Sequence, residues 1–220
     1  MEGVSRTDPE KFLRLMDGVV FGHSEDQGIL RGHDFYHKKL DFRLSLPDQW
    51  RVDNQPNQLV AIRPDNKAAI LIQLDQRGDH DNAGQYLKNS FPNISQLKKL
   101  NRNSYSGITS GQTPFGNGPI RVAARIHGDH VFVFSGIAQS QLPDQQVYDT
   151  IKSFRKLNKS ELKLATAKHL KLVRVKSGDS FASLAKKLKL GRYGEEQLRL
   201  INGLYPDGEP EPGKLIKIIR

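Results

Sequence analysis

The 220-residue sequence contains no cysteine. Disulfides, thiolate zinc sites and cysteine nucleophiles all need that side chain, so its absence excludes the three of them together. No apolar run approaches the roughly 18 residues that a membrane-crossing helix needs, and the opening stretch MEGVSRTDPEKF has no signal-peptide hydrophobic region. We therefore expect a soluble chain with no membrane span.

The sequence also lacks the HExxH motif, in which two histidines one helical turn apart hold zinc and the glutamate acts as general base. The nearest pattern runs from His33 to His37; it has the four-residue spacing but leads directly into a predicted strand. Residues four apart in a strand lie about 13 Å apart and cannot share a metal ion. We predict no catalytic residue, no metal site and no cofactor in this chain.

Positive charge is concentrated at the C-terminal end. Residues 159–220 contain 14 Lys and Arg against 7 Asp and Glu, whereas the preceding 158 residues contain 20 against 17. A basic domain suits a polyanionic partner, such as nucleic acid, anionic lipid or an acidic cell-wall polymer. Nucleic acid is disfavoured, because only Phe181, Tyr193 and Tyr205 are available there for base stacking, and solvated helix faces are the commonest explanation of such charges.

Hydrophobic periodicity in residues 35–157 predicts an α+β domain, in which helices cover an antiparallel sheet. Alternation between Phe42 and Leu74 predicts a meander of four short strands. Two later runs of alternating residues flank Gly128-Asp129, a two-residue sequence typical of a β-hairpin.

Other segments of this domain carry weaker patterns. Apolar spacing predicts one helix at 83–91 and a second after Pro143, each able to pack on the sheet. The glycine-rich residues 107–118 lack the Gly-Lys-Ser/Thr ending of a phosphate-binding loop, and we expect a mobile loop there.

The domain is flanked by two segments without a core of their own. Residues 1–34 are predicted to form an N-terminal helix followed by a connecting segment; Thr7 and Glu10 have the spacing of a capping box, with Pro9 in the first turn. The polar residues 158–169 predict a linker.

The remaining residues, 170–220, predict a small domain of order βααβ. Val173 and Val175 alternate with basic residues as in a strand, and Ser180 is suited to cap the helix that follows. Acidic residues open a second helix that ends at Asn202-Gly203, and Pro212-Gly213 leads into a last strand.

In order and in residues this tail resembles a LysM module, a βααβ domain that in many bacterial proteins binds N-acetylglucosamine-containing polymers such as peptidoglycan. The resemblance is carried by Val173 to Ser180, Ala185, Leu200, Asn202, Pro212, Gly213 and Ile218.

The resemblance implies a ligand groove between the turn before the first helix and the turn after the second. There, backbone amides would bond acetamido groups while Phe181 or Tyr205 packs on a sugar face. The first wall of this groove is expected to consist of Gly178, Asp179, Ser180 and Phe181, and the second wall of Asn202, Gly203, Leu204 and Tyr205. The same residue types serve turns and helix caps, so a purely structural role for each stays open.

Two further resemblances concern the rest of the chain. The element order of residues 35–157, with FRLSLPDQW at 42–50, resembles the PsbP-like fold. The longer stretch from Asp8 to Trp50 is similar to the region that follows the catalytic domain in bacterial HExxH zinc metalloproteases of the HtpX and CAAX prenyl protease group. Its matches are Met16-Asp17-Gly18, Phe21-Gly22, Gly28, Arg31-Gly32, Phe35, His37, Phe42, Pro47 and Trp50.

These resemblances lead to one main hypothesis and two alternatives. The chain would be the non-catalytic C-terminal accessory region of a zinc metalloprotease in the bacterial cell envelope, on the periplasmic side. Zinc would be bound only by the absent catalytic domain, and the partners would be that protease domain, peptidoglycan and envelope proteins. Alternatively, the chain is a stand-alone peptidoglycan-binding module, or its basic tail binds nucleic acid.

Overall fold

The structure, a computed structural model, describes residues 9–220 and divides into two compact units. Residues 25–166 form one unit, which we call the sheet unit. Residues 9–24 join residues 167–220 in the other, the βααβ unit. The domain boundaries at 34/35, 157/158 and 169/170 stay predictions; in the structure, residues 9–24 pack on the C-terminal domain. Thr7, half of the predicted capping box, lies outside the described residues.

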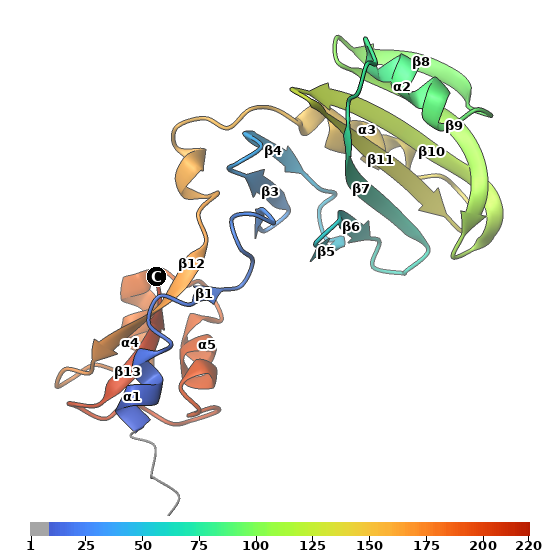
Figure 1. Cartoon of the computed structure of the whole chain (residues 1–220). Coiled ribbons are helices and arrows are strands. Elements are labelled where there is room, and N and C mark those ends of the chain that lie inside the picture. Colours follow the sequence, from blue (N-terminus) through green and yellow to red (C-terminus); the bar gives the residue numbers. More distant parts are fainter. Residues whose placement is uncertain (1–8) are drawn as a thin grey trace, which may run out of the picture. The chain divides into compact units, whose positions relative to one another are not determined.

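The sheet unit is built on an antiparallel sheet of seven strands in the order β5-β6-β7-β11-β10-β9-β8 (Figure 1). The strands are β5 (Arg51–Gln55), β6 (Gln58–Ile62), β7 (Ala68–Gln76), β8 (Ser95–Asn101), β9 (Ser104–Thr113), β10 (Gly116–His127) and β11 (His130–Ala138). The β10–β11 hairpin pairs His127 with His130 around Gly128-Asp129, so the predicted hairpin is confirmed.

A second sheet of the same unit has three short strands, β2 (Ile29–Arg31), β3 (Asp34–His37) and β4 (Phe42–Ser45). The sequence pattern placed residues 42–46 in one meander with the strands that follow, and this prediction was wrong. The residues of β4 pair with β3, and Gln49 at φ 62° lies in the turn that separates β4 from β5. Strands as short as β2 and β3 have too few residues for alternation to be recognised.

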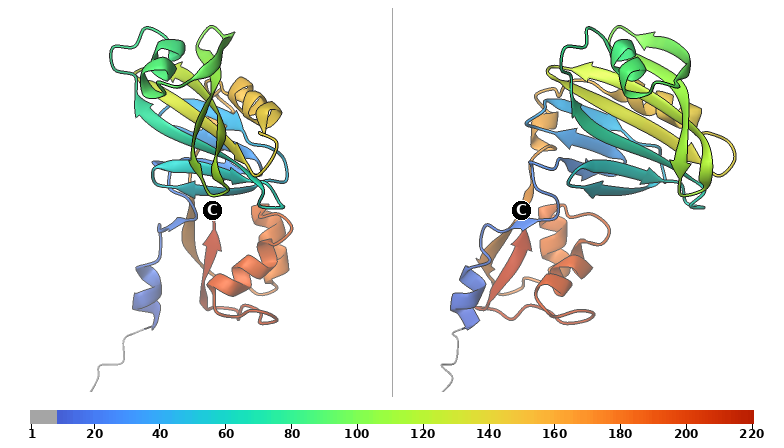
Figure 2. Two further views of the ribbon diagram at one scale, coloured as in Figure 1. Left: turned by 90° about the vertical axis from the view of Figure 1, so that its right-hand side faces the viewer. Right: turned by 45° about the vertical axis from the view of Figure 1, so that its right-hand side comes forward.

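The two faces of the large sheet are covered differently. Helix α2 (Ala83–Ser90) packs on one face, against Val122, Ala124, Val131 and Val133. Helix α3 (Asp144–Ser153) and the small sheet lie on the other face (Figure 2), and Phe132 and Phe134 belong to the core on that side. Since alternate side chains of β11 enter opposite cores, this strand is buried along nearly its whole length.

The prediction of a mobile loop at 107–118 was wrong, because these residues form the paired ends of β9 and β10. Backbone pairing continues from Ile108↔Arg121 to Thr113↔Gly116, around a tight turn. Gly107 is required by packing, because a Cβ there would lie 2.6 Å from the Ile94 side chain. A strand that gains little from side-chain burial and contains several glycines has no hydrophobic alternation, and so its sequence reads as a loop.

The βααβ unit contains β12 (Lys168–Arg174), α4 (Phe181–Leu188), α5 (Gly194–Ile201) and β13 (Leu215–Ile219), in the predicted order. The α+β prediction, with antiparallel sheets and a small βααβ module, is therefore confirmed. Phe181 and Leu198 are fully buried in its core, together with Ile219. The predicted linker, 158–169, contains a single turn, η1 (Glu161–Lys163), and its last two residues belong to β12.

The N-terminal residues complete this unit. Helix α1 (Pro9–Arg14) is followed by β1 (Val20–Phe21), which pairs with β12 and makes a sheet of order β1-β12-β13. Asp17 accepts hydrogen bonds from the Leu172 amide at 2.9 Å and from Lys171 Nζ at 3.1 Å, and these bonds lower the pKa of Asp17. The segment predicted as connecting chain therefore covers one edge of the βααβ sheet.

Candidate functional site

The turn before α4 is held by its own side chains. Asp179 Oδ2 accepts a hydrogen bond from the Lys176 amide at 2.9 Å, and Gly178 has the left-handed φ of 84° that a side chain rarely adopts. Ser180 and Ser183 form a reciprocal capping box at the start of the helix, which confirms the predicted cap. The polar atoms of Asp179 and Ser180 thus bond within the turn.

Phe181, predicted as a possible sugar-stacking residue, is fully buried in the core of the βααβ unit. Its ring is therefore not available to pack on a sugar. Its backbone amide donates to Glu209 Oε2 at 2.9 Å, so that amide also has a partner within the chain. A fully buried ring at the first turn of an amphipathic helix is core packing, and the sequence pattern cannot distinguish that role from ligand stacking.

The turn after α5 is held by Asn202. Its Nδ2 donates to the carbonyl oxygens of Leu198 and Lys217, at 2.8 and 2.9 Å, and its Oδ1 accepts from the Lys217 amide at 2.8 Å. Lys217 belongs to β13, the edge strand of its sheet, where backbone groups facing outward lack a strand partner. Asn202 satisfies both groups of Lys217 and therefore has a structural role.

The next three residues complete the second predicted wall. Gly203 has a φ of 71°, and Leu204 packs partly buried against the core. Tyr205 differs from both, because 60% of it is exposed. Of the two aromatic residues predicted to contact a sugar, Tyr205 is the one whose ring remains accessible.

Glu209 links the two predicted walls and was missed by the sequence reasoning. Besides accepting from the Phe181 amide, its carboxylate pairs with Arg199 of α5, which also pairs with Glu195 at 2.6 Å. The hydrogen bond from Phe181 and the charge of Arg199 lower the pKa of Glu209. The loop 204–209 is thereby held against the start of α4, and this loop carries Tyr205.

Local sequence signals could have found only part of this arrangement. Glu195 and Arg199 have the i,i+4 spacing of a helical ion pair. Nothing local connects Glu209 with Phe181, 28 positions earlier. Gly208 is also fixed by the loop, because a Cβ there would lie 2.7 Å from the Leu204 carbonyl oxygen.

A cavity of about 210 Å³ adjoins this loop in the βααβ unit. Leu13 of α1 lines it together with Asn202, Leu204 and Glu209, and β13 closes it with Leu215 to Lys217. It shares Leu204 and Glu209 with the loop 204–209, but it includes neither Tyr205 nor residues 178–181. The predicted groove residues therefore do not all line one cavity.

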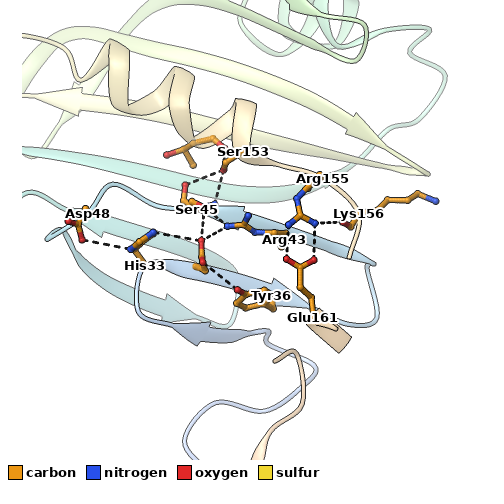
Figure 3. Close-up of polar contacts among 11 residues, drawn as sticks. His33, Tyr36, Arg43, Ser45, Asp48, Ser153, Arg155, Lys156 and Glu161 are labelled. Carbon is orange, nitrogen blue, oxygen red and sulfur yellow. Dashed lines mark hydrogen bonds and ion pairs between the residues drawn. The ribbon is translucent and has the colours of Figure 1, made fainter. Parts of the chain in front are cut away.

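A polar cluster in the sheet unit includes Arg43, Ser45 and Ser153 (Figure 3). Asp34 Oδ1 accepts from Ser45 Oγ at 2.6 Å and pairs with Arg43, and the Ser45 amide donates to Ser153 Oγ at 2.7 Å. Because the Ser45 hydroxyl bonds directly to a carboxylate, with no imidazole between them, the arrangement is not a nucleophile with its base. It joins β4 to the end of α3.

The two histidines with the four-residue spacing have separate surroundings. His33 lies 3.8 Å from the carboxylate of Asp48, whereas His37 is buried and its Nδ1 accepts from the Leu40 amide at 3.3 Å. Within residues 9–220, no three His, Asp or Glu side chains converge as metal ligands would. Over the same residues, no helix has the length and apolarity of a membrane span.

Comparisons with known proteins single out the βααβ unit. Residues 173–218 match the LysM domain family. The chain has no match among curated proteins. Neither the PsbP-like nor the metalloprotease resemblance has a counterpart among these findings.

The chain is also similar to a crystal structure at 1.50 Å resolution of a protein from Bacteroides thetaiotaomicron VPI-5482, with a TM-score of 0.44 and 13% identity. That match covers 73% of this chain and 59% of the other, and a likeness of this size carries no functional argument. The family match and the βααβ order agree, so the C-terminal module is similar to LysM domains in both sequence and fold.

Proposed function

We propose that the chain binds N-acetylglucosamine-containing polymers, peptidoglycan above all, through its LysM-like module. The observation that carries the proposal is the match of residues 173–218 to the LysM family on a βααβ fold. Exposed aromatic rings pack on the apolar faces of ligands, and Tyr205 offers such a ring on the loop that Glu209 anchors. The proposal places the chain in the bacterial cell envelope, outside the cytoplasm.

Two exposed tyrosines allow a matched test. Tyr205 is 60% exposed and lies in the predicted second wall, whereas Tyr193 is 61% exposed and lies before α5, beneath the guanidinium of Arg192. The full chain and its Tyr205→Ala and Tyr193→Ala variants are sedimented with purified sacculi. We expect Tyr205→Ala to lower the bound fraction severalfold and Tyr193→Ala to leave it unchanged, since stacking contacts of this kind contribute about 0.5–1.5 kcal/mol.

The outcome separates glycan binding from attraction of a basic protein to a polyanion. Retention that soluble chitooligosaccharide removes, and that survives 0.5 M salt, supports the proposal. Retention that disappears with salt and is insensitive to sugar contradicts it, because that behaviour is charge neutralisation. Equal losses in the two tyrosine variants would show that the predicted wall is not the contact surface.

The accessory-region hypothesis rests on the sequence resemblance alone and concerns a longer protein. It adds to glycan binding the expectation that this chain has no peptidase activity of its own. Incubation with unfolded protein substrates and added Zn²⁺ tests it; metal-dependent cleavage that a chelator abolishes would contradict it.

A further inference from the structure

The hairpin of β9 and β10 extends past the end of β8, the edge strand of the large sheet (Figure 1). Strand β8 pairs with β9 only as far as Ser95↔Ile108. On the other side of β9, pairing with β10 continues to Thr113↔Gly116. In the described part of the chain, no strand pairs with the β8 side of β9 beyond Ile108. We call this side of residues 109–113 the open edge.

The open edge presents backbone groups that face away from β10. Ser110 lies opposite Pro119, which has no N–H and cannot complete a hydrogen-bonded pair. In an antiparallel ladder the backbone groups of such a residue point to the other side, and the pattern repeats every second residue. Two positions earlier, the Ile108 carbonyl oxygen accepts from Ser95 Oγ on the β8 side, at 3.2 Å. The N–H and C=O groups of Ser110 and Gln112 therefore point outward.

A groove of about 620 Å³ adjoins the open edge. Asn93 and Ser95 line it where β8 begins, and residues of β9 and β10 line the rest. Gly111 and Gly118 face each other across the hairpin, and the Cβ position of Gly118 has no atom within 4 Å. Glycine inside a strand is typical of a site that another backbone approaches closely. Space for a further chain is therefore present beside β9.

The outer side of β8, in contrast, is unsuited to further pairing. Gln96 has a left-handed φ of 50°, and the register of β8 shifts between Ser95 and Lys98, which marks a β-bulge. Lys98 and Lys99 are exposed. Bulges and lysines are devices by which proteins prevent edge strands from pairing. The open edge has neither, since its register is continuous and residues 107–120 contain no charged side chain.

Charge around the open edge narrows the class of partner. Residues 82–128, which we call the basic region, contain six Lys or Arg and no Asp or Glu. Arg121 is neutralised by Asp144 of α3 at 2.8 Å, which leaves five cations in excess. A second copy of this chain would bring the same positive charge to the edge, and like-charge repulsion disfavours that pairing. The field of the basic region attracts an acidic segment instead.

We propose that the open edge binds an extended acidic peptide segment of another protein, which pairs with β9 as an additional strand. The backbone of the segment bonds to the outward N–H and C=O groups of Ser110 and Gln112, and its carboxylates lie in the positive field of the basic region. In recognition of this kind, main-chain hydrogen bonds supply the affinity. The open edge lies wholly within the sheet unit, so this proposal and glycan binding by the LysM-like module can fail independently.

The test uses acetyl-Glu-Val-Glu-Val-Glu-amide as the probe, because valine favours an extended backbone and glutamate supplies the charge. The full-length chain, labelled with ¹⁵N, is titrated, and the shifts and hydrogen exchange of its backbone amides are followed. We expect saturable shifts at the end of β9 and slower exchange of the Ser110 and Gln112 amides. The amides of Thr109 and Gly111 face β10 and are the internal control, so their exchange rates should not change.

Two matched peptides separate backbone pairing from charge. The same peptide with every residue N-methylated keeps its carboxylates but cannot donate backbone hydrogen bonds, and it should not slow exchange at the open edge. The lysine counterpart, acetyl-Lys-Val-Lys-Val-Lys-amide, should bind about tenfold more weakly at low ionic strength, and salt should reduce that difference. Equal binding of the methylated peptide would exclude strand pairing, and equal binding of the lysine peptide would exclude selection for an acidic partner.

Two variants at one position locate the contact. Ser110→Pro removes the outward N–H without removing a hydrogen bond to β10, whereas Ser110→Ala keeps that N–H and removes only the hydroxyl group. We expect about fivefold weaker binding of the probe for the first variant and unchanged binding for the second. Signal dispersion in the same spectra reports folding, and if Ser110→Pro unfolds, the methylated peptide decides the question.

Three results would overturn the proposal. The first is a titration without saturable shifts at Ser110 and Gln112. The second is equal binding of the probe to the two variants at Ser110. The third is a dimer of the chain alone, seen in sedimentation and lost in Ser110→Pro, because a second copy would then be the occupant of the open edge.

Discussion

The aromatic core of the sheet unit and the turns of the βααβ unit are held by contacts that differ in sequence separation. In the sheet unit the ring of Phe42 stacks on Phe154 at 4.7 Å and meets Phe132 at 4.6 Å, so residues about a hundred positions apart form one core. In the βααβ unit the turns are held by contacts a few positions long, such as Ser180 with Ser183 and Asn202 with Leu198. One unit depends on tertiary packing, and the other adds many local bonds to a smaller core.

The two units nevertheless share one arrangement, a glutamate held by an arginine and a backbone amide. Glu161 accepts two bonds from Arg155, at 2.6 and 2.8 Å, and one from the Asn158 amide at 3.0 Å. Glu209 accepts from the Phe181 amide and pairs with Arg199. The first pair fixes the chain after α3, while the second holds the loop that carries Tyr205, so the same chemistry has a structural effect in one unit and positions a candidate binding surface in the other.

The largest expected effect tests the long-range core. Phe42 is 2% exposed and contacts Phe35, His127, Phe132 and Phe154. Phe42→Ala should lower the free energy of unfolding of the sheet unit by about 3–5 kcal/mol, since it removes apolar contacts and leaves a cavity. Urea unfolding followed by resolved signals of each unit measures the loss. Phe115→Ala, at a position 36% exposed, is the control and should change little.

A smaller effect is expected where the βααβ unit relies on one polar side chain. Asn202→Ala removes three hydrogen bonds and leaves the backbone groups of Lys217 without their partner. A loss of about 1–3 kcal/mol in the free energy of unfolding of this unit should follow, measurable in the same urea titration.

This variant sharpens the distinction between structure and binding. Tyr205→Ala should lower sacculus binding without lowering the melting temperature. Asn202→Ala should lower the melting temperature, because the role of Asn202 is structural. A variant at Asn202 with full stability and lost binding would show that Asn202 contacts the glycan directly, contrary to the role assigned to it above.

The smallest effect compares the two glutamates by pH. Hydrogen bonds from Arg155 and Asn158 lower the pKa of Glu161 in the folded state below its ordinary value of 4.5, and the Phe181 amide with Arg199 does the same for Glu209. A lowered folded pKa means that the stabilisation is present above the unfolded pKa and is lost as the pH falls through the folded one. Both units should therefore become less stable below about pH 4.5.

The exposed fractions of the two glutamate side chains predict which carboxylate contributes more to stability. The Glu161 side chain is 11% exposed and that of Glu209 is 46% exposed, so solvent screens the second pair more. Glu161→Gln should reduce the loss of unfolding free energy at acid pH more than Glu209→Gln does. Glu196→Gln, on the exposed face of α5, should leave that loss unchanged. Equal slopes for all three variants in acid unfolding curves would contradict the assignment of these pKa shifts.

How much of the fold could be predicted depended on the range of the contacts. The capping residue Ser180, the turn at Gly128-Asp129 and the order of the βααβ module follow from neighbours a few positions apart. Contact range was not the only factor: β4 and residues 107–118 pair with strands that are nearby in sequence, but β3 is too short and the ends of β9 and β10 too rich in glycine to show hydrophobic alternation. The union of residues 9–24 with the C-terminal module spans nearly the whole chain.

The candidate site shows the same division. The sequence by itself determined that a LysM-like module is present and which two turns flank its pair of helices, because glycine, asparagine and serine have local conformational preferences. Only the tertiary structure decided that Phe181 is core, that Asn202 supports an edge strand and that Glu209 joins the two walls. Burial and long-range pairing depend on the whole fold, and a pattern of neighbouring residues does not contain them.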